Sequence, residues 1–248
     1  MLLCCFPAAH AAPEPLKVAL YLHLDNAYYG IGQKHLRAIL TPEAGFACTT
    51  VTAEDIKAGK LDGFDVLIVP GGAGSKQAAM LGEAGRDTIK KFVADGGGFV
   101  GICAGAYLAS ADYPWSIHLI NAKAVDKKHW ARGKGDVTIT FSESGKNKLK
   151  FDGDTATVNY RQGPLFAPAG KPDLPPYESL ATFTTEIVEN GATPGAMVGT
   201  TAIASAPFGE GRVICFNPHP ERPEGPTSLI LHGVRWAGST QKKDPAVK

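Results

Sequence analysis

Continuous apolar runs of strand length alternate with segments whose apolar residues recur every three or four positions through the first half of the chain. The apolar runs predict buried strands at residues 16–23, 46–52, 64–70 and 97–103. The periodic segments predict helices at residues 32–40, 53–61 and 86–97, with Thr52 as a candidate N-cap of the second. Strands that alternate with helices in this way predict a parallel, doubly wound α/β sheet of the flavodoxin-like kind.

The pattern changes from about residue 125 to residue 185, where short alternating pieces are separated by Gly, Pro and Asn. We interpret 125–185 as a β-rich insertion. Two further strands, joined by a Gly-containing turn at 208–212, and an amphipathic helix at 228–238 follow it. These elements predict one domain over residues 12–240 and a tail at 241–248.

The chain begins with MLLCCFPAAHAAPEP, a short apolar segment followed by small residues. This order is typical of an export signal, which predicts a signal peptide at residues 1–11 and a periplasmic or secreted protein. The segment lacks a basic start, so an apolar tail on a cytoplasmic protein is the alternative. Cleavage would leave Cys48, Cys103 and Cys215, enough for at most one disulfide.

Composition narrows the classes of partner. Hydrophobic residues make up 44% of the 248 residues, which supports a sizeable core. The net charge of +1 provides no field that would attract nucleic acid, so we expect no nucleic-acid partner. Beyond the leader, no segment approaches the roughly 18 apolar residues of a membrane span, so we expect no stable membrane insertion.

One cysteine stands at a predicted junction between strand and helix. In GICAG, Cys103 lies between Gly101 and Gly105, and glycines permit the close backbone approach of a nucleophile elbow. A thiol at a helix N-terminus is favoured as thiolate, the form that attacks carbonyls. The alternative from this motif alone is an inert buried thiol.

Two other motifs supply the remaining parts of a nucleophilic site. In NPHPE, His219 and Glu221 fit the roles of a base and of the carboxylate that orients it, although a solvated loop histidine is the alternative. The turn VPGG offers the amide of Gly72, which together with the amide of Ala104 would form an oxyanion hole. A simple turn is the alternative for VPGG.

VPGG, GICAG and HPE, in that order on an α/β chain, resemble the class I glutamine amidotransferase-like superfamily. The segments FDVLIVPGGAG, IKKFVADGGGFVGICAGAYLAS and NYRQGPLF resemble the branch typified by the N-terminal domain of biotin-protein ligase, and the resemblance spans residues 16–236. It implies a flavodoxin-like sheet and a Cys103–His219–Glu221 triad. The biotin-activating loop is absent from this sequence, so we expect no ligase activity.

These observations favour a cysteine hydrolase or amidase that cleaves a C–N bond of a small-molecule amide. Gly71, Tyr107, Tyr160 and Gly163 are candidate substrate-pocket residues, and packing is the alternative role of the last three. The competing hypothesis is a catalytically silent module of the same fold that binds a ligand or regulates a partner. A metal site at the triad has little support because no paired metal-binding motif is present, and we expect no cofactor.

Overall fold

The computed structural model describes residues 14–23 and 30–239. The predicted signal peptide and the predicted tail therefore lie outside the described residues. Of the predicted single domain, residues 14–23 and 30–239 can be compared with the structure.

Five parallel strands form the centre of the molecule. They are β1 (Leu16–Tyr21), β2 (Phe46–Val51), β3 (Val66–Val69), β4 (Gly98–Ile102) and β11 (Gly211–Phe216). Their order is β2-β1-β3-β4-β11, and each neighbouring pair runs parallel. This is the flavodoxin-like order, so the predicted fold class is confirmed.

The predicted β-rich insertion continues the same sheet. Beyond β11 the order is β10-β9-β6-β7, all antiparallel, and β5 and β8 pair beside β10 to complete an 11-stranded sheet. The bounds are β5 (Ala122–Ala124), β6 (Lys134–Phe141), β7 (Thr155–Arg161), β8 (Phe166–Pro168), β9 (Glu178–Phe183) and β10 (Thr201–Phe208). Parallel pairing is thus confined to the five central strands, and every strand beyond β11 pairs antiparallel with its neighbours.

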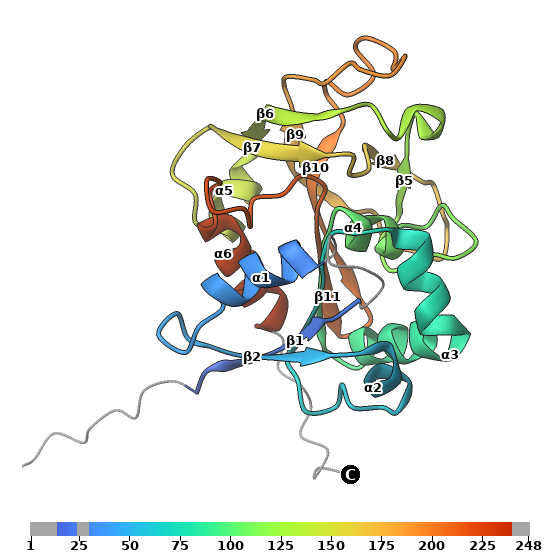
Figure 1. Ribbon diagram of the computed structural model, residues 1–248, viewed down its shortest axis with the longest axis vertical. Coiled ribbons are helices and arrows are strands. Elements are labelled where there is room, and N and C mark those ends of the chain that lie inside the picture. Colours follow the sequence, from blue (N-terminus) through green and yellow to red (C-terminus); the bar gives the residue numbers. More distant parts are fainter. Residues whose placement is uncertain (1–13, 24–29, 240–248) are drawn as a thin grey trace, which may run out of the picture.

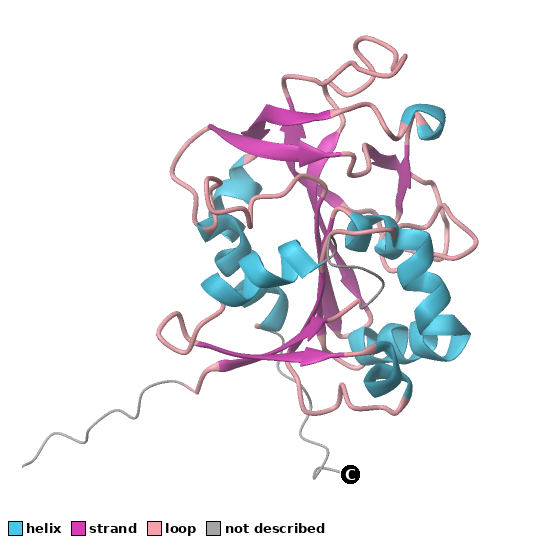
Figure 2. Ribbon diagram, viewed as in Figure 1, coloured by secondary structure: helices cyan, strands magenta, loops and turns pink. Residues whose placement is uncertain are grey.

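Helices cover both faces of the sheet (Figures 1 and 2). One face carries α1 (Gly30–Ile39), α5 (Glu143–Leu149) and α6 (Ser228–Gly238), and the other carries α2 (Ala53–Lys57), α3 (Gly74–Ala94) and α4 (Ala104–Ala109). Two separate clusters of buried apolar side chains match these two faces. A sheet buried on both sides explains why its central strands are almost continuously apolar.

Most predicted helices are confirmed, with two corrections. Thr52 caps α2 through a capping box with Asp55. The helix predicted at 86–97 begins earlier, at Gly74, and changes direction at Gly82, whose φ of 61° is not helical. The glycine-rich stretch after β3 conceals this start. Helix α5 was not predicted, although Ser142 caps it by accepting a hydrogen bond from the Gly145 amide.

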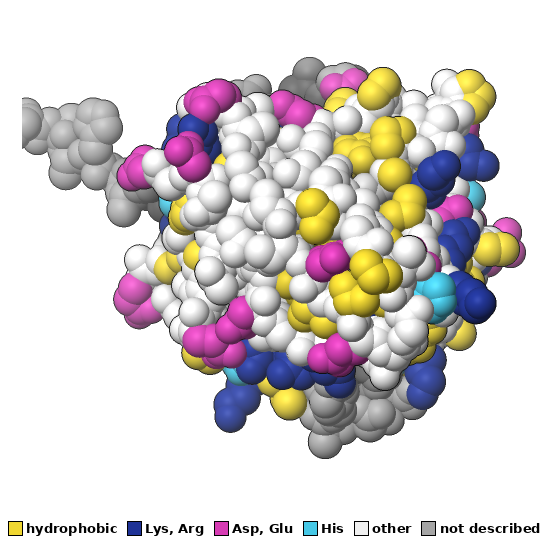
Figure 3. Space-filling model, turned by 90° about the horizontal axis from the view of Figure 1, so that it is seen from above, with side chains coloured by type: hydrophobic (Ala, Val, Ile, Leu, Met, Phe, Trp, Pro, Cys, Tyr) yellow, Lys and Arg dark blue, Asp and Glu magenta, His cyan; other side chains and the backbone are white. Residues whose placement is uncertain are grey.

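The insertion end of the molecule is seen from above in Figure 3. Hydrophobic and acidic side chains are scattered over this face, and basic side chains lie toward the margins. None of the helices in the described ranges has the length and apolar character needed to cross a membrane.

Candidate active site

Cys103 occupies a sharp turn between β4 and α4. Its backbone angles are φ 51° and ψ −98°, a conformation that costs a non-glycine residue on the order of 1–3 kcal/mol. The Cys103 amide donates to the carbonyl of Phe216 at the end of β11 (2.8 Å), which ties the turn to the neighbouring strand. The sharp strand-to-helix turn predicted at Cys103 is therefore present in the backbone.

The glycines that flank Cys103 are required by close packing. A Cβ atom on Gly105 would lie 2.0 Å from the carbonyl oxygen of Val69 on β3, and one on Gly101 would lie 2.6 Å from the carbonyl oxygen of Gly105. Any side chain at either position would push α4 away from the sheet. Glycine is therefore required at both positions of GICAG because α4 packs directly against the ends of β3 and β4.

His219 and Glu221 follow β11 at the same edge of the sheet. The Nδ1 atom of His219 lies 2.7 Å from Oε1 of Glu221, and the side chains are 11% and 1% exposed. The His219 amide donates to the carbonyl of Asn159 on β7 (2.8 Å), so the insertion helps to fix the loop. The predicted partnership of these two residues is present in the geometry.

The electrostatics of His219 favour its protonated form. Burial disfavours the imidazolium, but the opposing effects of Glu221 and Cys103 are larger in sum and raise the pKa of His219 to about 10.

Gly71 shows how closely the two motifs approach each other. A Cβ atom built there would lie 2.7 Å from Cε1 of His219 and 3.7 Å from Cβ of Cys103. Gly71, the second residue after β3, therefore lies beside the side chains of both His219 and Cys103. The Cys103 side chain is 6% exposed, and its Sγ donates to the carbonyl of Arg161 at the end of β7 (3.5 Å).

A cavity of about 650 Å³ opens over these groups. Six of the predicted site residues line it, namely Gly71, Gly72, Cys103, Tyr107, His219 and Glu221. Ala104 is buried below it as the first residue of α4, and an N–H in that position lacks an intrahelical acceptor. The three motifs that lie far apart in the sequence thus meet at one edge of the sheet.

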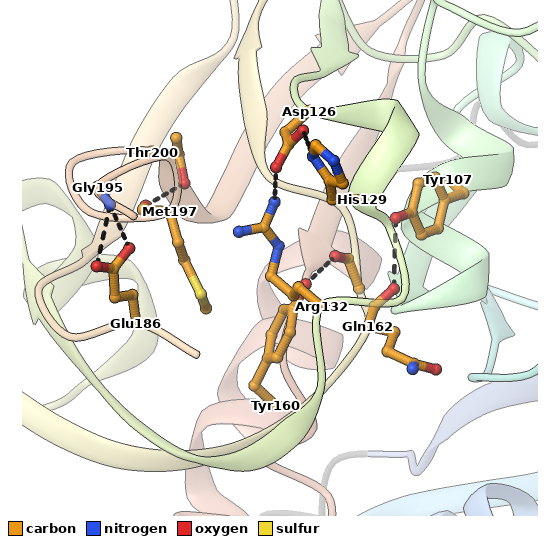
Figure 4. A network of polar contacts seen from close by, with 11 residues as sticks. Tyr107, Asp126, His129, Arg132, Tyr160, Gln162, Glu186, Gly195, Met197 and Thr200 are labelled. Carbon is orange, nitrogen blue, oxygen red and sulfur yellow. Dashed lines mark hydrogen bonds and ion pairs between the residues drawn. The ribbon is translucent and has the colours of Figure 1, made fainter. Parts of the chain in front are cut away.

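Tyr160 and Gly163 are placed behind the cavity wall. The buried Tyr160 hydroxyl donates to the Gly163 carbonyl (2.8 Å), and a Cβ on Gly163 would lie 1.8 Å from the carbonyl oxygen of Asn217. Neither residue lines the cavity, because this close packing directs both into the core. Between them, Gln162 lines the cavity with a φ of 64° and accepts a hydrogen bond from Tyr107 (3.3 Å; Figure 4).

Sequence reasoning missed one side of the cavity. Aromatic and basic residues contribute to it, namely Tyr113, Trp115, Lys127, Trp130, Lys134 and Arg161. They lie in irregular segments or at strand ends, where neither periodicity nor a motif selects them. The one sequence feature that could have indicated these cavity residues is the concentration of aromatic and basic side chains in YPWS (113–116) and KKHW (127–130).

A buried ion pair supports that side. Arg132 is 1% exposed and pairs with Asp126, whose other oxygen lies 2.6 Å from Nδ1 of His129 (Figure 4). Burial opposes ionisation of Asp126, but hydrogen bonds from both basic partners outweigh burial and lower its pKa. Lys127 and Trp130 lie in the turn between Asp126 and Arg132, so the pair fixes two cavity residues.

The three cysteines of the described residues form no disulfide with one another. Cys48, Cys103 and Cys215 all carry free thiols, and burial raises the pKa of Cys48 and Cys215. Across residues 14–23 and 30–239, no three His, Cys, Asp or Glu side chains are grouped so as to hold a metal ion.

Comparison with known proteins places the chain in a structural context. Residues 31–130 match the family described as "Biotin-protein ligase, N terminal". No curated protein matches the chain.

Solved structures share the fold at low sequence identity. A ThuA-like protein from Bacteroides uniformis is similar with a TM-score of 0.63 and 16% identity, over 98% of this chain and 100% of that one. One from Parabacteroides merdae gives 0.63 and 12%, over 93% and 92%. The β-galactosidase of Bacillus circulans sp. alkalophilus gives 0.54 and 13%, over 90% of this chain but only 30% of the enzyme.

These likenesses agree with the flavodoxin-like strand order described above. We conclude that the chain has the fold of the class I glutamine amidotransferase-like superfamily, and that its residues 31–130 are similar to the N-terminal region of biotin-protein ligase.

Proposed function

We propose that the protein is a cysteine hydrolase that cleaves a C–N amide bond of a small molecule. One observation carries the proposal: Cys103, held in a strained elbow, lies beside an imidazole that is bonded to a buried carboxylate, under a cavity large enough for a substrate. Strained backbone and buried charge both cost stability, and they persist where a function requires them.

The reaction follows from these groups. The Cys103 thiolate attacks the amide carbonyl to form a C–S bond, and the carbonyl oxygen becomes an oxyanion. Donation of the His219 proton to the nitrogen lets the C–N bond break, so the amine leaves and a thioester remains. His219, now neutral, takes a proton from water, whose oxygen displaces the sulfur and releases the acid. Glu221 keeps the imidazole oriented throughout.

The oxyanion requires donors on the side of the carbonyl that faces the sheet. The amides of Gly72 and Ala104 are the candidates, since Gly72 lines the cavity and Ala104 begins α4 immediately after the nucleophile. Backbone amides in such positions are preorganised and so stabilise developing charge effectively.

A silent ligand-binding module is the second candidate function. The raised pKa of His219 favours it, because an imidazole that holds its proton at neutral pH is a poor base toward water. Under this alternative the cavity binds a ligand and the thiol takes no part in turnover.

Alkylation and turnover together test the proposal. Iodoacetamide at neutral pH, followed by peptide mass spectrometry, should modify Cys103 faster than it modifies free cysteine, and Cys48→Ala should serve as the control. A panel of small amides should yield amine with the wild type and none with Cys103→Ala. If iodoacetamide modified Cys103 no faster than free cysteine, the proposal would be refuted. Ligand-induced thermal stabilisation that survives Cys103→Ala, without product, would establish the binding module.

A further inference from the structure

Three aromatic rings that line the cavity contact one another in a row. The Tyr107 and Tyr113 rings meet edge to face with centroids 5.9 Å apart. The Tyr113 and Trp115 rings stack, with centroids 4.7 Å apart and planes inclined by 21°. We call Tyr107, Tyr113 and Trp115 the aromatic row. Aromatic rings attract one another in such offset and edge-to-face arrangements, so the row is suited to the packing of a further ring.

Two buried serines fix the loop that carries two of these rings. The Ser110 hydroxyl donates to the carbonyl of Tyr107 (2.8 Å), and the Ser116 hydroxyl accepts a hydrogen bond from the Tyr113 amide (3.2 Å). The two hydroxyl oxygens lie 3.4 Å apart, and both serines are buried. The loop after α4 is therefore tied to the helix, and a binding surface that is already ordered loses less entropy when a ligand binds.

Both ends of the aromatic row are attached to elements that carry candidate reactive groups. Tyr107 lies one turn after Cys103, and its amide donates to the Cys103 carbonyl (3.1 Å). At the other end, a Cβ atom on Gly74 would lie 3.1 Å from Cη2 of Trp115 and 3.2 Å from the carbonyl oxygen of Ala104. Trp115 therefore packs where α3 begins, at the same glycine that borders the residue after the nucleophile.

Two polar groups at the aromatic row already have partners within the protein. The Tyr107 hydroxyl donates to the carbonyl of Gln162 (3.3 Å). The Lys127 ammonium, which lies 4.6 Å from the Tyr113 ring centroid, pairs with Asp112 (2.8 Å). Neither group requires a ligand as its partner, so this part of the cavity offers a ligand mainly aromatic surface.

We infer that the cavity selects an amide that carries a planar aromatic group, which packs against the aromatic row. The amide rests on the proposed function, but the preference for an aromatic group does not, because it follows from the rings that line the cavity. Contact between rings favours an aromatic group over a saturated ring of the same carbon number, which buries apolar area without that contact.

Binding is measured by calorimetry on the full chain carrying Cys103→Ala, so that turnover plays no part. Two matched pairs of neutral probes are used. Benzamide and cyclohexanecarboxamide carry the ring on the carbonyl side of the amide, and acetanilide and N-cyclohexylacetamide carry it on the nitrogen side. The aromatic member of at least one pair should bind about fivefold more tightly than its saturated partner, and in any case more than twofold, as expected for an added aromatic contact. Burial of apolar area alone would favour the saturated member.

Variants assign the preference to the aromatic row. Tyr113→Leu and Trp115→Leu should each reduce the ratio of the two affinities toward one, whereas Trp115→Phe keeps a ring and should retain most of the ratio. Trp236→Leu is the matched control, because Trp236 is also half-buried but packs against Lys148 and Arg212 and does not line this cavity. It should leave the ratio intact. Urea unfolding of each variant checks that it is folded.

The outcomes separate aromatic selection from catalysis. Ratios within twofold of one in both pairs, tighter binding of both saturated probes, or no measurable binding of either aromatic probe would overturn the inference. So would a ratio that is unchanged in both Tyr113→Leu and Trp115→Leu. The pair with the larger ratio identifies the side of the amide that carries the ring. Hydrolysis by the chain with Cys103 intact is measured separately, so failure of catalysis is distinguishable from failure of aromatic selection.

Discussion

Replacing Gly71 with alanine would separate reactivity from stability at this site. The added Cβ would lie 2.7 Å from Cε1 of His219, whereas ordinary contacts of a Cβ begin near 3.4 Å, so the ring must recede by about 0.7 Å. The obstacle is a side chain rather than backbone, and Gly71 does not have a positive φ, so an alanine fits the chain itself. The main consequence of the substitution is therefore a change in the distance between the His219 imidazole and Cys103.

The size of the effect follows from that displacement. Misplacing a reacting group by about 1 Å can lower a rate by about 100-fold, so we expect Gly71→Ala to reduce turnover and Cys103 alkylation by about 10- to 100-fold. We expect the free energy of unfolding to change by less than about 1 kcal/mol, because no core atom is removed and the ring can move. Nucleophile reactivity should thus fall in a protein that remains folded.

The assay compares iodoacetamide rates at neutral pH with urea unfolding of the same samples. Gly63→Ala is the matched control, since nothing lies within 4 Å of a Cβ at Gly63 and its φ is not positive. An alkylation rate of Cys103 in Gly71→Ala within twofold of the wild-type rate would contradict the prediction, as would a rate that fell only because the protein unfolded.

Two further predictions concern charged groups. Because the pKa of His219 is about 10 in the fold and 6.5 as a free group, the protonated ring stabilises the fold fully below about pH 6.5, and this contribution is lost as the pH rises toward 10. Urea unfolding between pH 6 and 10 should show that loss, and Glu221→Gln should flatten it; equal slopes in both proteins would contradict the assignment. Arg132→Met should cost about 3 kcal/mol of unfolding free energy, because it leaves the carboxylate of Asp126 largely buried without its guanidinium partner. Lys171→Met, at an exposed position, is the control, and a loss equal to the control's would show that the pair contributes nothing.

The periodicity of the first half predicted the elements that build the core. β1, β3 and β4 fall within the predicted runs because strands buried on both faces are almost continuously apolar. The edge strand β2 also falls within its predicted run, although only its two ends are buried. Helix α3 was misplaced at its start, since the glycines after β3 look like a turn and the kink at Gly82 interrupts the periodicity. The sequence indicated correctly that the insertion is β-rich. It could not indicate that the insertion's strands join the main sheet, because the alternation of apolar and polar residues does not specify which strands pair.

For the site, sequence and structure contributed different information. Cys103, His219 and Glu221 could be selected because GICAG and HPE contain reactive residue types in constrained local surroundings. Tyr160 and Gly163 could not be assigned correctly from the sequence, because whether a residue faces a cavity or the core depends on which backbone lies behind it, here that of Asn217. Arg161 and Lys134 acquire their shared position only through the register of β6 against β7.

Local patterns in the chain were enough to predict the alternation of strands and helices, the sharp turn at Cys103 and the chemical types of the candidate site residues, because hydrophobic period and glycine spacing are local properties. The meeting of the Gly71, Cys103 and His219 segments, the extension of the sheet by the insertion, and the aromatic and cationic side chains of the cavity wall became visible only in the folded chain. These are contacts between distant segments, and they are set by strand order, register and close backbone packing, which no local pattern encodes.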